Sequence, residues 1–211
     1  MGFSLDHILY FHMPRTAGDS IRKSISNFPK MCKITTHHSQ VHAIKNIKQH
    51  STYSNKKSFT FVRNPYNRLY SSYNWIMNRD TSRNEDLSGI DLLEYDYLKG
   101  FNDFNDFATN VDVDGINKKF MIHFHPCSKW IWDSKLLITN FFKFEDLFSN
   151  DDSFLHWCKD NGLNYQGLVD ETHKSKWTER NYFDYFNSES IFNINKLYNK
   201  DFKLFGYEKI W

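Results

Sequence analysis

Two short segments of this 211-residue chain combine cations, hydroxyl groups and tight turns in a way that suits anion binding. The first, residues 12–20 (HMPRTAGDS), follows an apolar run and places Arg15, Thr16 and Ser20 in one loop. A loop between the end of a strand and the start of a helix presents unpaired backbone N–H groups and the positive end of the helix dipole, which favours phosphate. The sequence therefore predicts an anion-binding loop here.

This loop does not match the common nucleotide-binding pattern GxxxxGK[ST]. Gly18 is its single glycine, and no lysine precedes Ser20. An ordinary ATP or GTP phosphate loop is therefore disfavoured. Taken alone, the loop is also consistent with a plain turn that carries a surface arginine.

The second segment, residues 61–73 (FVRNPYNRLYSSY), adds a further cation and hydroxyl in a similar setting. It places Arg63 at the end of an apolar strand and Ser71 eight residues later, on the helix that follows. We interpret Arg68, between them, as a structural ion-pair partner. Both segments thus have a strand–loop–helix setting.

Together the two segments resemble the sulfotransferases that use 3′-phosphoadenosine 5′-phosphosulfate (PAPS), in particular the carbohydrate-type and bacterial members. The first is similar to the family's 5′-phosphosulfate loop, commonly written PKTAGTS, and the second to its 3′-phosphate motif. The C-terminal residues 196–207 (KLYNKDFKLFGY) also resemble those members. The resemblance implies a P-loop-like, three-layer α/β fold with a central parallel sheet flanked by helices, and a single sulfotransferase domain over residues 1–211.

Carried over position by position, the resemblance implies a set of residues that hold PAPS. They are Pro14, Arg15, Thr16, Ala17, Gly18, Asp19, Ser20, Arg63, Ser71, Lys174 and Ser175. The last two lie in residues 171–177, which are similar to a family loop that closes over the nucleotide; a solvated basic turn is the open alternative.

Two positions depart from the family pattern. Arg15 stands where the family has its catalytic lysine, and it is expected to stabilise the leaving phosphate; arginine donates bidentately to phosphate but is not a proton donor. Asp19 replaces a hydroxyl residue. Because a carboxylate facing phosphate would repel it, we expect Asp19 to cap the helix or to turn away.

A histidine is expected to accept the proton of the acceptor hydroxyl, since its side chain titrates near neutral pH. Residues 36–47 (THHSQVHAIKNI) resemble the family segment that carries such a base, and this aligns His38 with it, with His37 as the alternative. We expect no metal site. His38 and His42 lack the glutamate of HExxH, and His123 and His125, on a predicted strand, have no carboxylate or cysteine pair nearby in sequence.

Two strand–loop–helix units are expected to position these residues. Apolar runs predict strands at residues 6–12 and 58–63, and helical spacing predicts helices at residues 21–28 and 66–78. This order is typical of a parallel sheet with helices over it. Further helices are expected at residues 40–49, 87–98, 103–110, 145–161 and 188–200, strands at 120–124 and 136–144, and a packed tail at 201–207.

The composition of the chain limits which partners and properties are expected. With 27 Lys and Arg against 25 Asp and Glu, the net charge is +2, so no nucleic-acid partner is expected. Aromatic residues make up 18% of the chain, which excludes a disordered protein and supports a core of large rings.

The three cysteines (Cys32, Cys127 and Cys158) are scattered along the sequence, which suits reduced thiols. Lacking a long apolar run or a signal-peptide pattern, the chain is expected to be soluble and cytoplasmic, without membrane insertion; a bacterial or viral context fits.

These features predict transfer of a sulfuryl group from PAPS to a hydroxyl acceptor, with a saccharide as the expected acceptor class. The product of the donor would be adenosine 3′,5′-bisphosphate (PAP). Two alternatives stay open. One is a P-loop-type nucleotide kinase or phosphotransferase, and the other is a catalytically degenerate binding protein of the sulfotransferase fold, which the departures at Arg15 and Asp19 support.

Overall fold

A computed structural model describes residues 2–5, 8–26, 56–78, 89–168 and 182–211 of the chain. They divide into two compact units. The sheet unit comprises residues 1–63 and 127–180, and the helical unit comprises residues 64–126 and 181–211. No helix among the described residues is long and apolar enough to cross a lipid bilayer.

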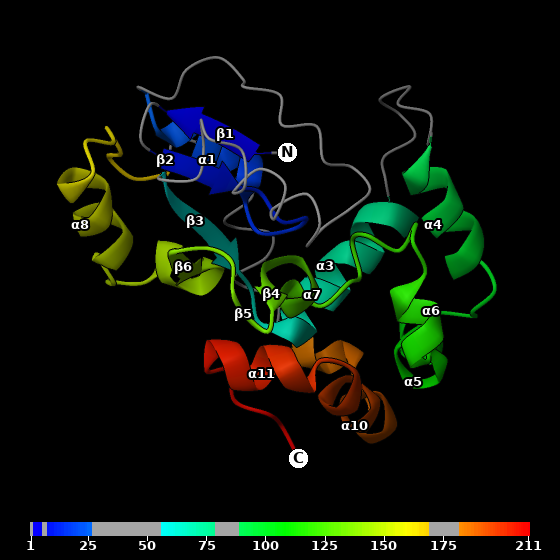
Figure 1. Ribbon diagram of the computed structural model, residues 1–211. Coiled ribbons are helices and arrows are strands. Elements are labelled where there is room, and N and C mark those ends of the chain that lie inside the picture. The colour runs from blue at the N-terminus through cyan, green and yellow to red at the C-terminus, as the bar shows by residue number, and fades with distance from the viewer. Residues whose placement is uncertain (1, 6–7, 27–55, 79–88, 169–181) are drawn as a thin grey trace. The chain divides into compact units, whose positions relative to one another are not determined.

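The sheet unit is built on four strands in the order β1–β2–β3–β6 (Figure 1). They are β1 (Gly2–Leu5), β2 (Ile8–Phe11), β3 (Lys57–Val62) and β6 (Asn140–Lys143). The strands β2, β3 and β6 are parallel to one another, and β1 pairs with β2 in the antiparallel sense. The parallel sheet confirms the expected α/β fold. The edge strand β1 was not anticipated.

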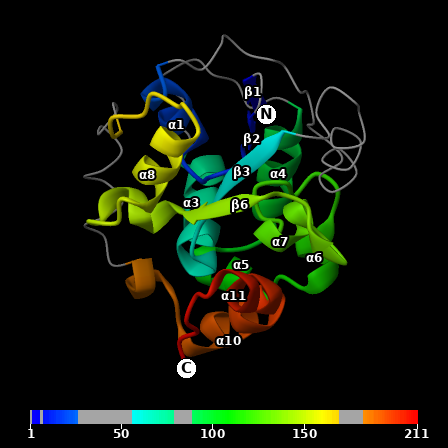
Figure 2. The same cartoon turned by 60° about the vertical axis from the view of Figure 1, so that its left-hand side comes forward.

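Two helices, α1 (Gly18–Ser24) and α8 (Ser153–Asp160), lie close together beside the strands (Figure 2). Residues of both helices and of β2 and β3 form one buried core that is rich in large rings. Because side chains alternate along a strand, residues 8 and 10 of β2 share a face with residues 59 and 61 of β3. The ring of Phe59 lies at the centre, with its centroid 4.7 Å from that of Tyr10 and 4.9 Å from that of Trp157. The aromatic-rich composition thus builds a buried core, as expected.

The remaining elements among the described residues of the sheet unit are short. They are α7 (Cys127–Ile131), β4 (Trp132–Asp133), β5 (Lys135–Leu136) and the 3-10 helix η2 (Phe144–Phe148). The strands β4 and β5 form a separate antiparallel pair.

The helical unit is organised around α3 (Pro65–Met77). This helix begins sharply because the Asn64 side chain accepts the backbone N–H of Tyr66, and Pro65 occupies the first helical turn. The other elements that the structure describes in this unit are α4 (Ile90–Leu98), α5 (Phe104–Asn110), α6 (Val113–Asn117), the 3-10 helix η4 (Tyr182–Tyr185), α10 (Ser188–Leu197) and α11 (Asn199–Phe205). The Asn193 amide on α10 donates to two carbonyls at the C-terminal end of α5, those of Ala108 and Val111, at 2.9 Å each.

Several expected boundaries are wrong for local reasons. The predicted helix at residues 21–28 ends at Ser24, because Ile25 is extended and forms a bridge with Tyr165. The predicted helix at 145–161 is interrupted, and α8 begins only at Ser153. The Asp151 carboxylate accepts the backbone N–H of Ser153 at 2.7 Å, which satisfies a donor at this helix start. The predicted helix at 188–200 is divided at Tyr198, and α11 takes up the expected tail. The predicted helix at 40–49 lies outside the described residues.

The strand expected at residues 120–124 is also wrong. These residues form turns, in which the backbone N–H groups of Phe124 and His125 both donate to the Met121 carbonyl at 3.1 Å. The carbonyls of His123 and Phe124 accept hydroxyl protons from Ser72 (2.7 Å) and from the Tyr198 side chain (2.6 Å). With these groups satisfied inside the helical unit, the segment has no sheet to join.

Replacement of Phe59 by alanine tests the role of the aromatic core. We expect Phe59→Ala to lower the free energy of unfolding by about 3–5 kcal/mol, because it removes a buried ring and leaves a cavity. Guanidinium denaturation followed by tryptophan fluorescence measures the change. Phe192 on α10, which is 70% exposed, supplies the matched control, and its replacement should change stability by less than about 0.5 kcal/mol. Equal losses in the two variants would contradict this account.

Candidate functional site

The loop between β2 and α1 has a backbone suited to holding an anion. Arg15 and Ala17 adopt left-handed conformations, with φ of 65° and 63°, which side-chain-bearing residues rarely do. Ala17 is the N-cap of α1, and no side chain caps the helix at this residue. Alternation of left-handed residues turns successive backbone N–H groups toward one concave side, which is how many phosphate sites are made. The strain therefore lies where the sequence predicts the anion.

Thr16 holds the shape of this loop. Its side chain is fully buried, and its hydroxyl donates to the Met13 carbonyl at 2.8 Å, which closes the turn from within. Pro14 and Ser20 are partly exposed. Asp19 lies in the first turn of α1, but Ala17 occupies the cap position that we considered for it. The side chain of Asp19 falls outside the description.

A histidine missed by the sequence analysis lies against the loop's glycine. A Cβ atom added to Gly18 would lie only 2.0 Å from the ring of His12, so no other residue fits without moving that ring. The same imidazole stacks on Tyr10, with ring centroids 6.3 Å apart. The lone glycine of the segment was the signal that something approaches the backbone closely here.

Arg63 reaches this loop from the end of β3. The carboxyl ends of the parallel strands β2 and β3 lie at one edge of the sheet, so the first residues after each strand become neighbours. A guanidinium nitrogen of Arg63 (Nη1) donates to the Arg15 carbonyl at 3.0 Å. The two predicted binding segments are therefore in direct contact through these residues of the sheet unit.

The Arg63 side chain is fixed in place. It is 5% exposed, and its guanidinium carbon lies 4.1 Å from the centroid of the Phe144 ring. Phe144 directly follows β6, the next parallel strand, so the same edge of the sheet supplies the cation and its aromatic support. An arginine held this way presents a preorganised fork of donors, which suits a phosphate.

Ser71 and Arg68 lie on α3 in the helical unit, and both are buried. Arg68 donates through Nη1 to the His125 carbonyl at 2.7 Å, which is a structural contact. The assignment of Ser71 to the 3′-phosphate stays a prediction from the sequence.

Four of the predicted site residues lie outside the described part of the chain. They are His37, His38, Lys174 and Ser175. Their roles stay predictions.

The cysteines that the structure describes do not offer a nucleophile. Cys127 and Cys158 are both reduced and buried. Burial raises the pKa of the Cys158 thiol to about 12, which leaves almost no thiolate at neutral pH. Nucleophilic cysteine chemistry is thus disfavoured at this position.

Sequence analysis also missed a carboxylate, Glu94 on α4, which pairs with His123. Glu94 and Leu98 are four residues apart and both are buried, so the carboxylate lies on the apolar face of its helix. The spacing of Glu94 and Leu98 was the sequence signal for a buried carboxylate. It did not indicate a pairing with His123, which was predicted to lie on a strand.

Comparisons with known proteins give one match. A family model described as "Sulfotransferase family" matches residues 4–208, nearly the whole chain. No curated protein and no solved structure matches.

The contact between Gly18 and His12 can be tested by a double-mutant cycle. We expect Gly18→Ala to lower the free energy of unfolding by about 1–3 kcal/mol, since the added methyl group displaces the imidazole. In a His12→Ala background the same change should be neutral or slightly stabilising, because alanine favours a helix over glycine. Chemical denaturation of the four proteins measures both effects. An equal cost in the two backgrounds would show that the ring is not the obstacle.

Proposed function

The chain belongs to the sulfotransferase family, and from this premise we propose that it transfers a sulfuryl group from PAPS to a hydroxyl group of a saccharide. We further propose that residues 1–211 act as one sulfotransferase domain. The observation that carries the proposal is the hydrogen bond from Arg63 to the Arg15 carbonyl, because it joins the two segments that resemble the family's donor-binding motifs.

The donor would be held by backbone and side chains together. The backbone N–H groups of residues 15–20, with the side chains of Arg15 and Ser20, would bind the 5′-phosphosulfate, as strained loops at the ends of parallel strands bind other phosphates. Pro14 and the buried Thr16 would shape this loop. Arg63, with Ser71, would bind the 3′-phosphate. Lys174 and Ser175 would complete the nucleotide side. The left-handed backbone at Arg15 and the buried guanidinium of Arg63 support the fit of PAPS to these residues.

The reaction needs alignment and charge stabilisation more than covalent chemistry. The acceptor oxygen attacks sulfur, the bond from sulfur to the bridging oxygen breaks, and that oxygen keeps the electron pair as PAP leaves. Arg15 would stabilise the charge that develops on the leaving phosphate; its guanidinium does so without giving up a proton. A histidine would accept the proton of the acceptor hydroxyl, and the family resemblance offers His38 for this role, with His37 as the alternative.

Binding of PAP, measured by isothermal titration, tests the donor site. We expect Arg63→Lys to weaken binding by about tenfold or more, because lysine keeps the charge but loses the two-pronged contact. Ser71→Ala should also weaken it. Lys23, an exposed cation in the last turn of α1, is the matched control, and Lys23→Ala should leave the affinity unchanged. Absence of PAP binding, or equal affinity in all four proteins, would refute the proposed donor.

Turnover with labelled PAPS and a panel of unsulfated oligosaccharides tests the role of Arg15. We expect Arg15→Ala to lower kcat by about a hundredfold, the usual cost of losing one group that stabilises a developing oxyanion. Arg15→Lys should stay active, since it restores the residue typical of the family. An inactive natural protein that gains turnover on Arg15→Lys would instead establish the degenerate-site alternative.

A further inference from the structure

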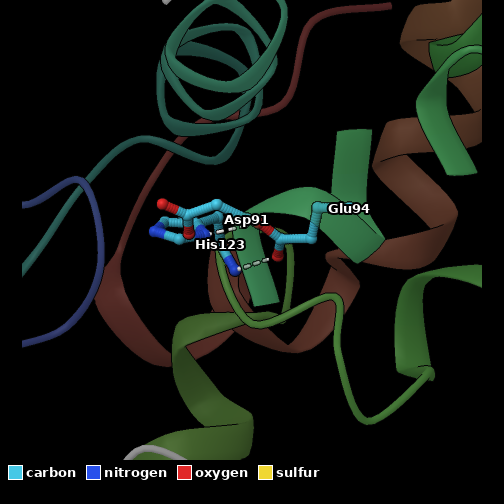
Figure 3. Close-up of side chains that lie close together, drawn as sticks. All are labelled: Asp91, Glu94 and His123. Carbon is cyan, nitrogen blue, oxygen red and sulfur yellow. Dashed lines mark hydrogen bonds and ion pairs between the residues drawn. The ribbon is translucent and has the colours of Figure 1, made fainter. Parts of the chain in front are cut away.

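The helical unit brings together three side chains whose chemistry suits a metal ion, those of Asp91, Glu94 and His123. Asp91 and Glu94 are three residues apart on α4, so they share one face of that helix. His123 comes from the turns at residues 118–125. One ligand atom of each side chain lies within 4.8 Å of those of the other two, and Figure 3 shows both carboxyl groups beside the imidazole ring.

The fold removes the reason for expecting no metal at His123. That expectation rested on the lack of a carboxylate near His123 in the sequence. The structure supplies carboxylates from a different element, since Glu94 lies 29 residues earlier in the chain. One imidazole and two carboxyl groups from two segments therefore meet within the same unit.

Glu94 is held so that one of its oxygens faces the ring. Its side chain is completely buried, and Oε1 accepts the backbone N–H of His123 at 2.9 Å. The second oxygen, Oε2, lies 2.6 Å from Nδ1 of the ring. In metal sites the ligating carboxylates are themselves hydrogen-bonded, as Glu94 is, because this fixes the direction of the ligand atom.

The burial of Glu94 calls for a compensating positive charge. Buried charges in proteins are paired or coordinate metals, because their removal from water is costly. The partner of Glu94 is an imidazole, which carries a positive charge only when it is protonated. Asp91 adds a second carboxyl group to the cluster. A divalent cation between these groups would offset the charge of both carboxylates.

Small movements would convert this cluster into a tetrahedral site. Ligand atoms about 2.0–2.2 Å from a zinc ion lie about 3.3–3.6 Å from one another. The Nδ1–Oε2 distance of 2.6 Å would open by about 1 Å or less, and separations of up to 4.8 Å would close by up to about 1.5 Å. A neutral imidazole carries its proton on either nitrogen, so an ion at Nδ1 leaves the proton on Nε2.

The mixture of ligands selects the class of ion. Calcium and magnesium favour sites made of oxygen atoms, so the imidazole nitrogen counts against them. Zinc accepts both histidine nitrogen and carboxylate oxygen, and a water molecule completes its sphere where three protein ligands are present. The cluster therefore suits a divalent transition ion of the zinc class.

The segment that carries the imidazole is anchored from α3. The Ser72 hydroxyl donates to the His123 carbonyl at 2.7 Å, and Arg68 donates to the His125 carbonyl at the same distance. His125 is held in turn, with Nε2 2.9 Å from the Lys118 carbonyl. A ligand held in place before the ion arrives loses less conformational freedom on binding, which favours affinity.

We propose that Asp91, Glu94 and His123 bind one divalent transition ion of the zinc class. Each residue supplies one ligand atom, and the ion joins α4 to the turns at residues 118–125. The site lies within the helical unit alone. It does not depend on the proposed transfer reaction.

Titration of zinc chloride into the untagged, full-length protein, stripped of metal with EDTA and dialysed, is the central test. We expect one ion to bind at this site with a micromolar or lower Kd, and Asp91→Asn to weaken that binding at least about tenfold, because an amide is a poorer ligand than a carboxylate. Asp91 is partly exposed, so this variant should fold. Asp96, an exposed acid on the same helix, is the matched control, and Asp96→Asn should leave the affinity unchanged.

X-ray absorption at the zinc edge identifies the ligands. We expect nitrogen and oxygen ligands with one imidazole, and loss of the imidazole signal in His123→Asn, whose amide can still donate to Glu94. His156 on α8 is exposed, and His156→Asn should leave the spectrum unchanged. Zinc at about a hundred times its Kd should also raise the melting temperature of the natural protein by about 5 °C or more, and that of Asp91→Asn by much less.

Three results would overturn the site. They are failure of zinc to bind the natural protein, equal affinity in Asp91→Asn and Asp96→Asn, and a sulfur ligand in the absorption spectrum, which would place the ion at a cysteine. Because the measurements are of binding and melting, they are valid whether or not the protein transfers from PAPS. A natural protein that binds zinc here but does not transfer would keep this site and refute only the proposed function.

Discussion

The parallel pairing of β2 with β3 is the constraint on which the rest of the sheet unit depends. It brings the loop after β2 and the first residue after β3 to one edge, although Arg15 and Arg63 are far apart in the sequence. The Thr60 hydroxyl reinforces the pairing by donating to the Phe11 carbonyl at 2.6 Å, next to that edge. The buried rings behind the sheet then hold both strands, so packing supports the geometry of the loop.

The parts of the structure that the sequence predicted are those in which local pattern and tertiary setting agree. Short apolar runs became β2 and β3, and the Asn-Pro dipeptide at Asn64 started α3 close to the expected residue. The strand predicted at 120–124 does not form, because the hydroxyl groups of Ser72 and Tyr198, both distant in sequence, donate to carbonyls of this segment. No window of neighbouring residues contains that information, and the same holds for the pairing of Glu94 with His123.

Arg63 and Glu94 are both buried ionisable groups, and their surroundings differ. Arg63 is supported by an aromatic face and a carbonyl, which leave its positive charge in place for a ligand. Both carboxyl oxygens of Glu94 contact one residue, the backbone N–H and the ring Nδ1 of His123, and these contacts fix the orientation of the imidazole. The first arrangement suits the binding of an anion, and the second fixes the orientation of a side chain.

The burial of Arg63 has a consequence for how a charged ligand is captured. With a net charge of +2, the protein exerts little long-range attraction on an anion in solution. A guanidinium that is 5% exposed, however, is screened far less by dissolved salt than a surface lysine. The rate at which an anionic ligand reaches the protein therefore depends on ordinary diffusion, while its rate of dissociation depends on short-range contact with Arg63. Affinity at this edge of the sheet should accordingly hold at ionic strengths that abolish binding to surface charge.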